Sequence, residues 1–364
     1  MLYNVQILRA VAAVLVVHAH AAGVAGLGLA WDGGAHGVDL FFVLSGFIIA
    51  YVGSLDTSQF MVRRLIRIVP IYWSSTVALY ALVLVMPSLF RSTSADPELL
   101  VKSMLFVPDG SHVQTSDGIP HPTLAGGWTL NYEMYFYVLF GIAIAFSKKW
   151  ATLITTALIT AVVIVVHVTS LDARPEAHFY GYPIVFEFAF GMLVFHLLRV
   201  AEASAKVTRP GAVQKWLLIA VIVIGFTLLA FSEMIFGPAP RWIVAGIPSF
   251  AILLAAVVLE RVHDVKITNR FAVMVGDASY VLYLIQAYVL YGVIRLVIGK
   301  RQFAELPGQL LTLPLMALSV VASIAVYKLY EQPILRVLKR KVIHSRPRAG
   351  AAVSAGVAPA SSAR

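Results

Sequence analysis

The chain has 364 residues, of which 60% are hydrophobic and only 13% are charged. This charged fraction is about half of that in ordinary soluble domains. It excludes a soluble globular protein, because a water-facing surface needs more charge. The many aliphatic and aromatic residues also exclude a disordered chain. The composition therefore predicts a polytopic membrane protein.

The net charge is +10, from 28 Lys and Arg against 18 Asp and Glu, and the chain has no cysteine. In a soluble protein this charge would suggest a nucleic-acid partner. Here most cations lie in short loops between apolar runs, so we expect no nucleic-acid partner and attribute the charge to membrane topology. The missing cysteines exclude disulfides, thiol catalysis and cysteine-ligated metals.

Apolar segments recur along most of the chain. A backbone inside lipid must satisfy its own hydrogen bonds, so each segment is expected to be a helix. The sequence thus predicts an all-α fold with about ten transmembrane helices. We expect one transmembrane domain over 1–335 and a basic, disordered cytoplasmic tail at 336–364. The ten segments are 5–22, 35–53, 70–88, 127–146, 151–168, 183–198, 217–233, 242–259, 278–297 and 308–329.

The distribution of Lys and Arg predicts the orientation. Arg9 near the N-terminus, the loop after the second segment, every second loop after that one and the C-terminal tail hold twenty of these cations, against six in the other loops. By the positive-inside rule both termini are expected to be cytoplasmic. The apolar N-terminal stretch is interpreted as a retained span, because no basic residue precedes it and Arg9 interrupts it. The long non-cytoplasmic loop at 89–126 is a candidate lid or a plain connector.

The first predicted helix carries Arg9 and His20. They are 11 residues apart, about 16 Å along a helix, and about 1100° of rotation places them on one face. An isolated arginine at this depth can simply extend to the interface, and an isolated histidine can bond to a neighbouring helix. Charges at membrane depth are costly, so the shared face favours a functional role for both residues.

The second predicted helix opens with GVDLFFVLSGF. Its Asp39 lies near the outer boundary and can pair with His20, which would orient the ring and raise its basicity. Ser45 and Gly46 are small residues near the middle of the membrane. For both we favour close helix packing as the explanation.

A cluster of arginines precedes the third predicted helix, in RRLIRIVPIYW. Arg63 and Arg67 are four residues apart, and Arg64 and Arg67 are three apart, so either pair can present adjacent guanidinium groups. Such a cluster commonly serves as a topology signal. The functional interpretation is recognition of phosphates, which suit guanidinium groups.

Glu133, in WTLNYEMYFYVLF, is expected in the outer half of the fourth predicted helix. It can bond locally to Tyr137, or share a polar cavity with His20 and Asp39. Glu187 lies within a span and has no assigned role. Glu331, at the cytoplasmic boundary, can pair with a cytoplasmic arginine. The ionisable residues thus divide by depth into a cytoplasmic basic cluster (Arg9, Arg63, Arg64, Arg67) and an outer cluster (His20, Asp39, Glu133).

Taken in order, these segments resemble the acyltransferase 3 family of integral membrane acyltransferases. LRAVAAVLVVHAH is similar to the first helix of the family, with an arginine followed by His20, and RRLIRIVPIYW is similar to its Arg-x-x-Arg-Ile-x-Pro-x-Tyr stretch. GVDLFFVLSGFII, WTLNYEMYFY, GDASYVLYLIQ and YEQP resemble further signatures. The resemblance covers about 1–335 and is nearest to members that acetylate exopolysaccharides.

The resemblance implies a membrane O-acyltransferase of the bacterial inner membrane that moves an acyl group, commonly acetyl, from cytoplasmic acetyl-CoA to a hydroxyl of a polysaccharide or lipid-linked glycan. Arg9, Arg63, Arg64 and Arg67 would then bind the phosphates of CoA. His20 would act as general base or transient acyl carrier, with Glu133 or Asp39 orienting it or the sugar. No metal is expected. The family often has histidine at the position of Gln286, which glutamine can replace as a hydrogen-bonding residue.

Two other classes of function suit the same helices. A secondary transporter of an acyl donor or another anion would also carry charges within its spans. The sequence shows no repeat and no pair of broken helices, which disfavours this class. A non-catalytic scaffold of a polysaccharide export complex is the third class.

Overall fold

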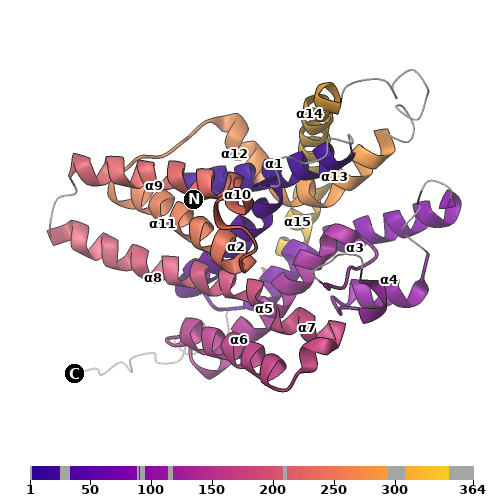
Figure 1. Ribbon diagram of the computed structural model, residues 1–364, viewed down its shortest axis with the longest axis horizontal. Helices are drawn as coiled ribbons and strands as arrows, with labels where there is room; N and C mark the ends of the chain where they lie inside the picture. The colour runs from indigo at the N-terminus through magenta and orange to yellow at the C-terminus, as the bar shows by residue number, and fades with distance from the viewer. Residues whose placement is uncertain are drawn as a thin grey trace, which may run out of the picture.

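The computed structural model describes residues 2–24, 33–87, 90, 95–113, 118–207, 211–293 and 308–343. Over these residues the fold is helical throughout, with one isolated antiparallel bridge between Val113 and Pro120 (Figure 1). The predicted all-α class is therefore confirmed for the described part of the chain.

The longer helices carry the fold, and short 3-10 or π-helical turns connect several of them. The α-helices are α1 (Tyr3–Val24), α2 (Gly37–Leu55), α3 (Phe60–Val85), α4 (Pro97–Met104), α5 (Trp128–Phe146), α6 (Ala151–Val168), α7 (Pro175–Gly181), α8 (Phe186–Val207), α9 (Ala212–Ala230), α10 (Ser232–Phe236), α11 (Ile247–Val262), α12 (Arg270–Asp277), α13 (Ser279–Val293), α14 (Gly308–Val326) and α15 (Gln332–Leu338). The 3-10 turns are η1 (Gly33–His36), η3 (Gly110–His112), η4 (Ala125–Gly127), η5 (Leu171–Ala173) and η6 (Pro183–Val185), and the π-helical turns are η7 (Trp242–Gly246), η9 (Tyr327–Glu331) and η10 (Lys339–Ile343).

Within the described residues, nine continuous helical segments are long and apolar enough to cross a membrane. A tenth candidate consists of α12 and α13, which are bent by 74° where they meet. This agrees with the expected number of about ten spans. The predicted segment at 278–297 corresponds to α13 as far as residue 293, whereas α12, which precedes the bend, is not predicted from the sequence.

Three predicted segments differ most from the structure. The third span begins at Phe60 instead of residue 70, because Pro70 lies inside α3 instead of starting it. A span can keep an internal proline when neighbouring groups satisfy the freed carbonyl. The short sixth segment is part of a longer span, Pro175–Val207, and the last span continues to Ile343. Most of the predicted tail, 344–364, lies outside the described residues.

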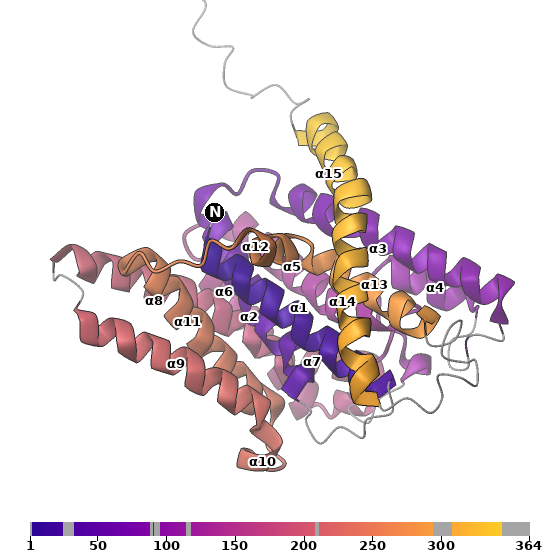
Figure 2. The same cartoon turned by 90° about the horizontal axis from the view of Figure 1, so that it is seen from above.

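Helix α1 lies in the interior of the bundle, in contact with α2, α11, α12, α13 and α14. Figures 1 and 2 show α8, α9 and α11 on one side of it and α3 with α4 on the opposite side. A helix surrounded in this way brings its few polar residues into contact with protein instead of lipid. Arg9 is therefore placed inside the assembly of helices, whereas His20, near the other end of α1, keeps an exposed side chain.

Helices α2 and α8 pack with unusually close backbones. A Cβ atom added to Gly46 would lie 2.1 Å from the carbonyl oxygen of Phe188, and one added to Gly191 would lie 2.0 Å from that of Val43. Only glycine allows this approach, which increases van der Waals contact between helices in a membrane. The packing role expected for Gly46 is confirmed.

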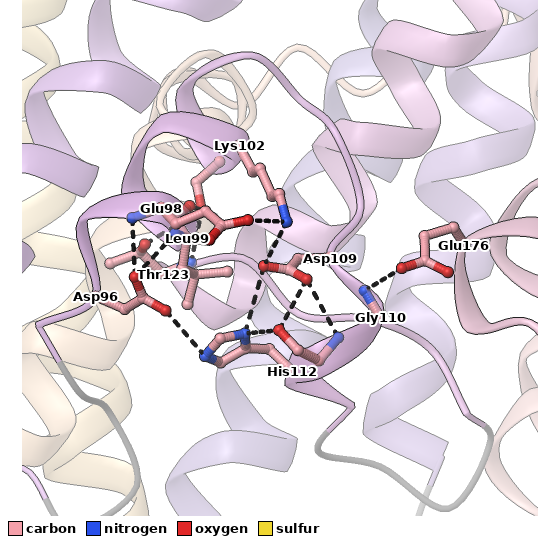
Figure 3. Close-up of polar contacts among 11 residues, drawn as sticks. Asp96, Glu98, Leu99, Lys102, Asp109, Gly110, His112, Thr123 and Glu176 are labelled. Carbon is pink, nitrogen blue, oxygen red and sulfur yellow. Dashed lines mark hydrogen bonds and ion pairs between the residues drawn. The ribbon is translucent and has the colours of Figure 1, made fainter.

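The segment between α3 and α5 is folded around a polar network (Figure 3). The Asp96 side chain caps α4, and Lys102 forms ion pairs with Glu98 at 2.6 Å and Asp109 at 3.3 Å. Burial disfavours the charged form of Asp109, but hydrogen bonds from Ser111 and Lys102 outweigh it and lower its pKa. This segment thus contains helices and specific contacts of its own, and it is more than an irregular connector.

Two further contacts attach this segment to the bundle. The indole nitrogen of Trp73 on α3 donates to the Met104 carbonyl at 2.8 Å, and the Gly110 amide donates to Glu176 on α7 at 2.9 Å. The segment therefore joins α3 and α7.

Candidate active site

A narrow cavity of about 160 Å³ lies between α1, α2, α3, α5 and α13. On α2 its lining runs from Val38 to Ile49, a separation of eleven residues that corresponds to about 16 Å of helix. The cavity is therefore long relative to its volume. Its charged and hydroxyl-bearing lining residues are Arg9, Ser45, Arg64, Arg67, Thr129, Glu133, Tyr137, Ser279, Tyr280 and Tyr283.

The first turns of α3 supply two of the cavity's arginines. The guanidinium of Arg64 lies 5.6 Å from the ring centre of Phe60 and 5.8 Å from that of Tyr137. Arg67 lies 5.3 Å from the ring centre of Tyr280 and forms an ion pair with the buried carboxylate of Glu331. The sequence-based pairing of Glu331 with an arginine is confirmed. Aromatic faces and one carboxylate thus hold both guanidinium groups in place.

Arg9 joins the same cavity from α1. Its guanidinium donates to Gln6 at 3.1 Å and to the Ser279 hydroxyl at 3.0 Å. Ser279 is the first residue of α13, directly after the break from α12. The N-terminal end of α13, which carries a partial positive charge, therefore faces the region of the three arginines.

Glu133 lies in this cavity with the arginines. Its Oε1 accepts hydrogen bonds from the Ser45 hydroxyl at 3.3 Å and from the Tyr137 hydroxyl. The local contact expected with Tyr137 is confirmed, whereas the grouping of Glu133 with His20 and Asp39 is wrong, because Glu133 lines the cavity and they do not. Depth along separate helices does not show how they tilt, and here α5 brings Glu133 against α2 and α3.

His20 lies beyond this cavity. Its side chain is exposed, its Nδ1 lies 2.9 Å from the Val16 carbonyl, and its ring faces Gln286. Gln286 is one turn further along α13 than Tyr283, the last α13 residue that lines the cavity. The residue that replaces the family histidine is thus next to His20.

The pairing of Asp39 with His20 that the sequence suggests is wrong. Both carboxylate oxygens of Asp39 accept hydrogen bonds from Arg241, each at 2.8 Å, and Oδ2 also lies 3.4 Å from His36 Nδ1. Asp39 is completely buried. Glu187 lies beside it, and His36 in turn bonds to Ser232 at 2.8 Å. The sequence does not indicate the pairing of Asp39 with Arg241, because Arg241 is 202 residues away and its approach is set by tertiary packing.

Arg63 is separate from the other arginines. It forms an ion pair with Asp56 at 2.6 Å, at the partly exposed turn between α2 and α3, and it does not line the cavity. Hydrogen bonds from Ser58, with a contribution from Arg63, lower the pKa of Asp56. The structure therefore selects Arg64 and Arg67 over Arg63 and Arg67 as the pair that faces the cavity.

Several site residues had no recognised signal in the sequence. Ser45 was assigned to packing together with Gly46, yet Ser45 faces the cavity and Gly46 faces α8. Arg241 lies in a predicted loop, where its charge indicates only topology. Tyr280 and Tyr283 lie in GDASYVLYLIQ, whose only signal is its resemblance to the family. Within the described residues there is no group of three or more histidine and acidic side chains placed to hold a metal ion.

Comparison with known proteins decides the family. A model described as an acyltransferase domain, Acyl_transf_3, matches residues 2–328. The chain belongs to this family. It is therefore a membrane-embedded enzyme that transfers acyl groups, and the cavity is its candidate active site.

The chain is similar to several bacterial proteins along most of its length. It is 32% identical to the exopolysaccharide production protein ExoZ of Rhizobium meliloti, over 83% of this chain and 90% of that protein. It is 26% identical to the acyltransferase MdmB of Streptomyces mycarofaciens, over 85% and 82%. It is 24% identical to the O-acetyltransferase OatA of Staphylococcus aureus, over 83% of this chain and 53% of that protein. No solved structure was found to match the chain.

Proposed function

We propose that this acyltransferase moves an acetyl group from acetyl-CoA to a hydroxyl of a surface or exported polysaccharide. One observation carries the proposal: three guanidinium groups, those of Arg9, Arg64 and Arg67, meet at a narrow cavity within the spans. The names of the relatives ExoZ and OatA support the polysaccharide acceptor and the acetyl group. The enzyme would lie in the bacterial inner membrane with both termini in the cytoplasm.

The guanidinium groups of the cavity and a helix end favour an anionic donor. Glu133 in the cavity and Glu331 and Asp277 near it offset the formal charge of the three arginines. The N-terminal end of α13 adds a partial positive charge. Guanidinium groups bind phosphate well through paired N–H donors. Arg9, Arg64 and Arg67 would therefore hold phosphates of CoA.

The shape of the cavity suits the pantetheine arm of CoA. The arm is a thin chain with two amide groups, and the cavity extends along about 16 Å of α2 at a volume of about 160 Å³. Ser45 and Glu133 lie part-way along it and can bond to these amides. Glu133 would then bind the donor, whereas the resemblance implied that it orients His20 or the sugar.

His20 would provide the chemistry beyond the far end of the arm. As general base it takes the proton of the acceptor hydroxyl while the hydroxyl oxygen bonds to the thioester carbonyl carbon. The carbon–sulfur bond then breaks, and the thiolate leaves and takes up a proton as free CoA. In this mechanism the hydrogen bond to the Val16 carbonyl and the side chain of Gln286 orient the His20 ring. Asp39 acts at a distance, by fixing the start of α2 through Arg241.

The proposal is tested by the O-acetyl content of surface glycans in a deletion strain complemented with variants. His20→Ala and Arg64→Ala are expected to abolish or strongly reduce acetylation while the protein level in the membrane stays normal. A matched control is Arg63→Ala, which removes an arginine from the same turn of α3 but not from the cavity, and it should acetylate normally. Normal acetylation in both His20→Ala and Arg64→Ala would refute the proposal.

The break between α12 and α13 favours one other function. Secondary transporters often bind their substrate at the ends of broken helices, and this 74° bend faces the cavity through Ser279. A transporter of acetyl-CoA or another anion would move the intact molecule, whereas the proposed enzyme moves only its acetyl group. Separate labels on the acetyl and adenine groups of the donor distinguish the two.

A further inference from the structure

Tyr283 is the last residue of α13 that lines the cavity, one turn before Gln286, which faces His20. Its hydroxyl donates to the Gly126 carbonyl at 2.9 Å and accepts a hydrogen bond from the Thr129 hydroxyl at 2.8 Å. Its ring lies edge-on to Phe41, with the ring centres 6.1 Å apart. The side chain is thus fixed at three points, by α2, by the turn before α5 and by α5 itself.

The order of residues along α13 places this ring between the arginines and His20. Ser279, at the start of α13, contacts Arg9, and Tyr283 lines the cavity one turn later. Gln286, one turn beyond, donates to the Tyr283 carbonyl and faces His20. Helices α1 and α13 contact each other over this length. A donor held by the arginines therefore meets Tyr283 before it reaches His20.

We propose that Tyr283 is the specificity-determining residue that restricts the acyl group to a short chain such as acetyl. This inference rests on the proposed function, since it takes the cavity as the site of acyl-CoA. The pantetheine arm would fill the length of the cavity and leave its acyl group against the Tyr283 ring. A two-carbon group fits with a small shift of the ring. A longer chain has to displace the ring from Gly126, Thr129 and Phe41 together.

The experiment uses the full-length protein in lipid nanodiscs, with a glycan acceptor and either acetyl-CoA or butyryl-CoA. One misplaced methylene changes discrimination by about 10- to 200-fold, so we expect the wild type to prefer acetyl-CoA in kcat/KM by about 100-fold or more. Tyr283→Ala should reduce this preference at least about 10-fold, chiefly through faster butyryl transfer. Tyr283→Phe and Thr129→Val, which keep the ring but remove its hydrogen bonds, should give smaller reductions.

The matched control is Tyr288→Phe on the same helix. The Tyr288 hydroxyl also donates to a backbone carbonyl, that of Ser75, but the residue does not line the cavity. This variant should keep the wild-type preference. It separates an effect on selectivity from a general loosening of α13.

Each outcome has a defined meaning. An unchanged preference for acetyl-CoA over butyryl-CoA in a folded Tyr283→Ala protein overturns the inference. If that variant does not fold, an unchanged preference in both Tyr283→Phe and Thr129→Val overturns it instead. Equal use of both donors by the wild type also overturns it while leaving the proposed function intact. If the wild type transfers no acyl group from either donor to the glycan, the proposed function fails as well.

Discussion

The buried ion pair between Asp39 and Arg241 allows a direct test of what Asp39 does. Asp39→Ala would leave Arg241 without its carboxylate, and Arg241→Met would leave a fully buried carboxylate without its cation. Breaking one partner of a buried pair costs about 3–5 kcal/mol. The Arg241 side chain is 26% exposed, so water can partly replace the lost carboxylate. We therefore expect Asp39→Ala to lower the free energy of unfolding by about 3 kcal/mol, and Arg241→Met to lower it by more.

The double variant Asp39→Ala/Arg241→Met removes both charges together. It should recover most of the lost stability, with a coupling energy of about 2 kcal/mol, within the range of directly interacting residues. The assay is the apparent melting temperature of the purified protein by fluorescence-detected size exclusion, with acetyl transfer measured on the same samples. If Asp39 acts only by fixing the start of α2, transfer recovers together with stability.

The opposite result would refute this reasoning. A double variant that is as stable as the wild type but as inactive as Asp39→Ala would show that the Asp39 carboxylate takes part in the chemistry. A loss of stability in the double variant equal to the sum of the losses in the two single variants would show that Asp39 and Arg241 are not coupled. A suitable control pair is Arg261 with Glu202, which is partly exposed and should contribute less than about 1 kcal/mol.

Three further predictions concern separate parts of the molecule. Arg64→Ala should raise the KM for acetyl-CoA about 10-fold or more through loss of a charge-assisted bond, without lowering the melting temperature. Arg67→Ala should lower both the affinity for acetyl-CoA and the melting temperature, because it leaves Glu331 buried without its cation. Equal melting temperatures for the two variants would contradict this. Gly46→Ala should destabilise the protein by about 3 kcal/mol or more by separating α2 from α8, while Gly23→Ala, where an added Cβ meets nothing within 4 Å, should be neutral in thermal unfolding. In the segment before α5, the lowered pKa of Asp109 gives stability that is lost as pH falls below 3.8, and the raised pKa of Lys102, set mainly by Glu98, gives stability that is lost as pH rises above 10.5. The protection of this segment from proteolysis should therefore be constant from about pH 5 to 9. A midpoint of this protection inside that pH range would refute the assignment.

The sequence was sufficient for the class of fold because lipid leaves few choices. Apolar runs of sufficient length predict spans, and the structure has helices at nearly all of them. The start of α3 was misplaced because proline is common at the first position of a helix, and here Pro70 is internal instead. The bend at Ala278 was missed because no proline or long polar insertion marks it.

The candidate site was only partly predictable. Arg9, Arg64, Arg67 and Glu133 could be chosen from residue type and depth, since charges within spans are rare. Which of them share a cavity depends on helix tilts and rotations that one sequence does not contain. The pairing of Asp39 with Arg241 and the position of Tyr283 depend on contacts across 202 and 154 residues of sequence, and local spacing carries no information about them.

The most direct test of the account follows both halves of acetyl-CoA in one experiment. The purified protein is reconstituted in liposomes that enclose a glycan acceptor, and acetyl-CoA labelled separately on its acetyl and adenine groups is added outside. We expect that the acetyl label becomes covalently attached to glycan, that the adenine label stays outside as free CoA, and that His20→Ala abolishes the transfer. Entry of both labels together, with no label on the glycan, would identify a transporter and contradict the account.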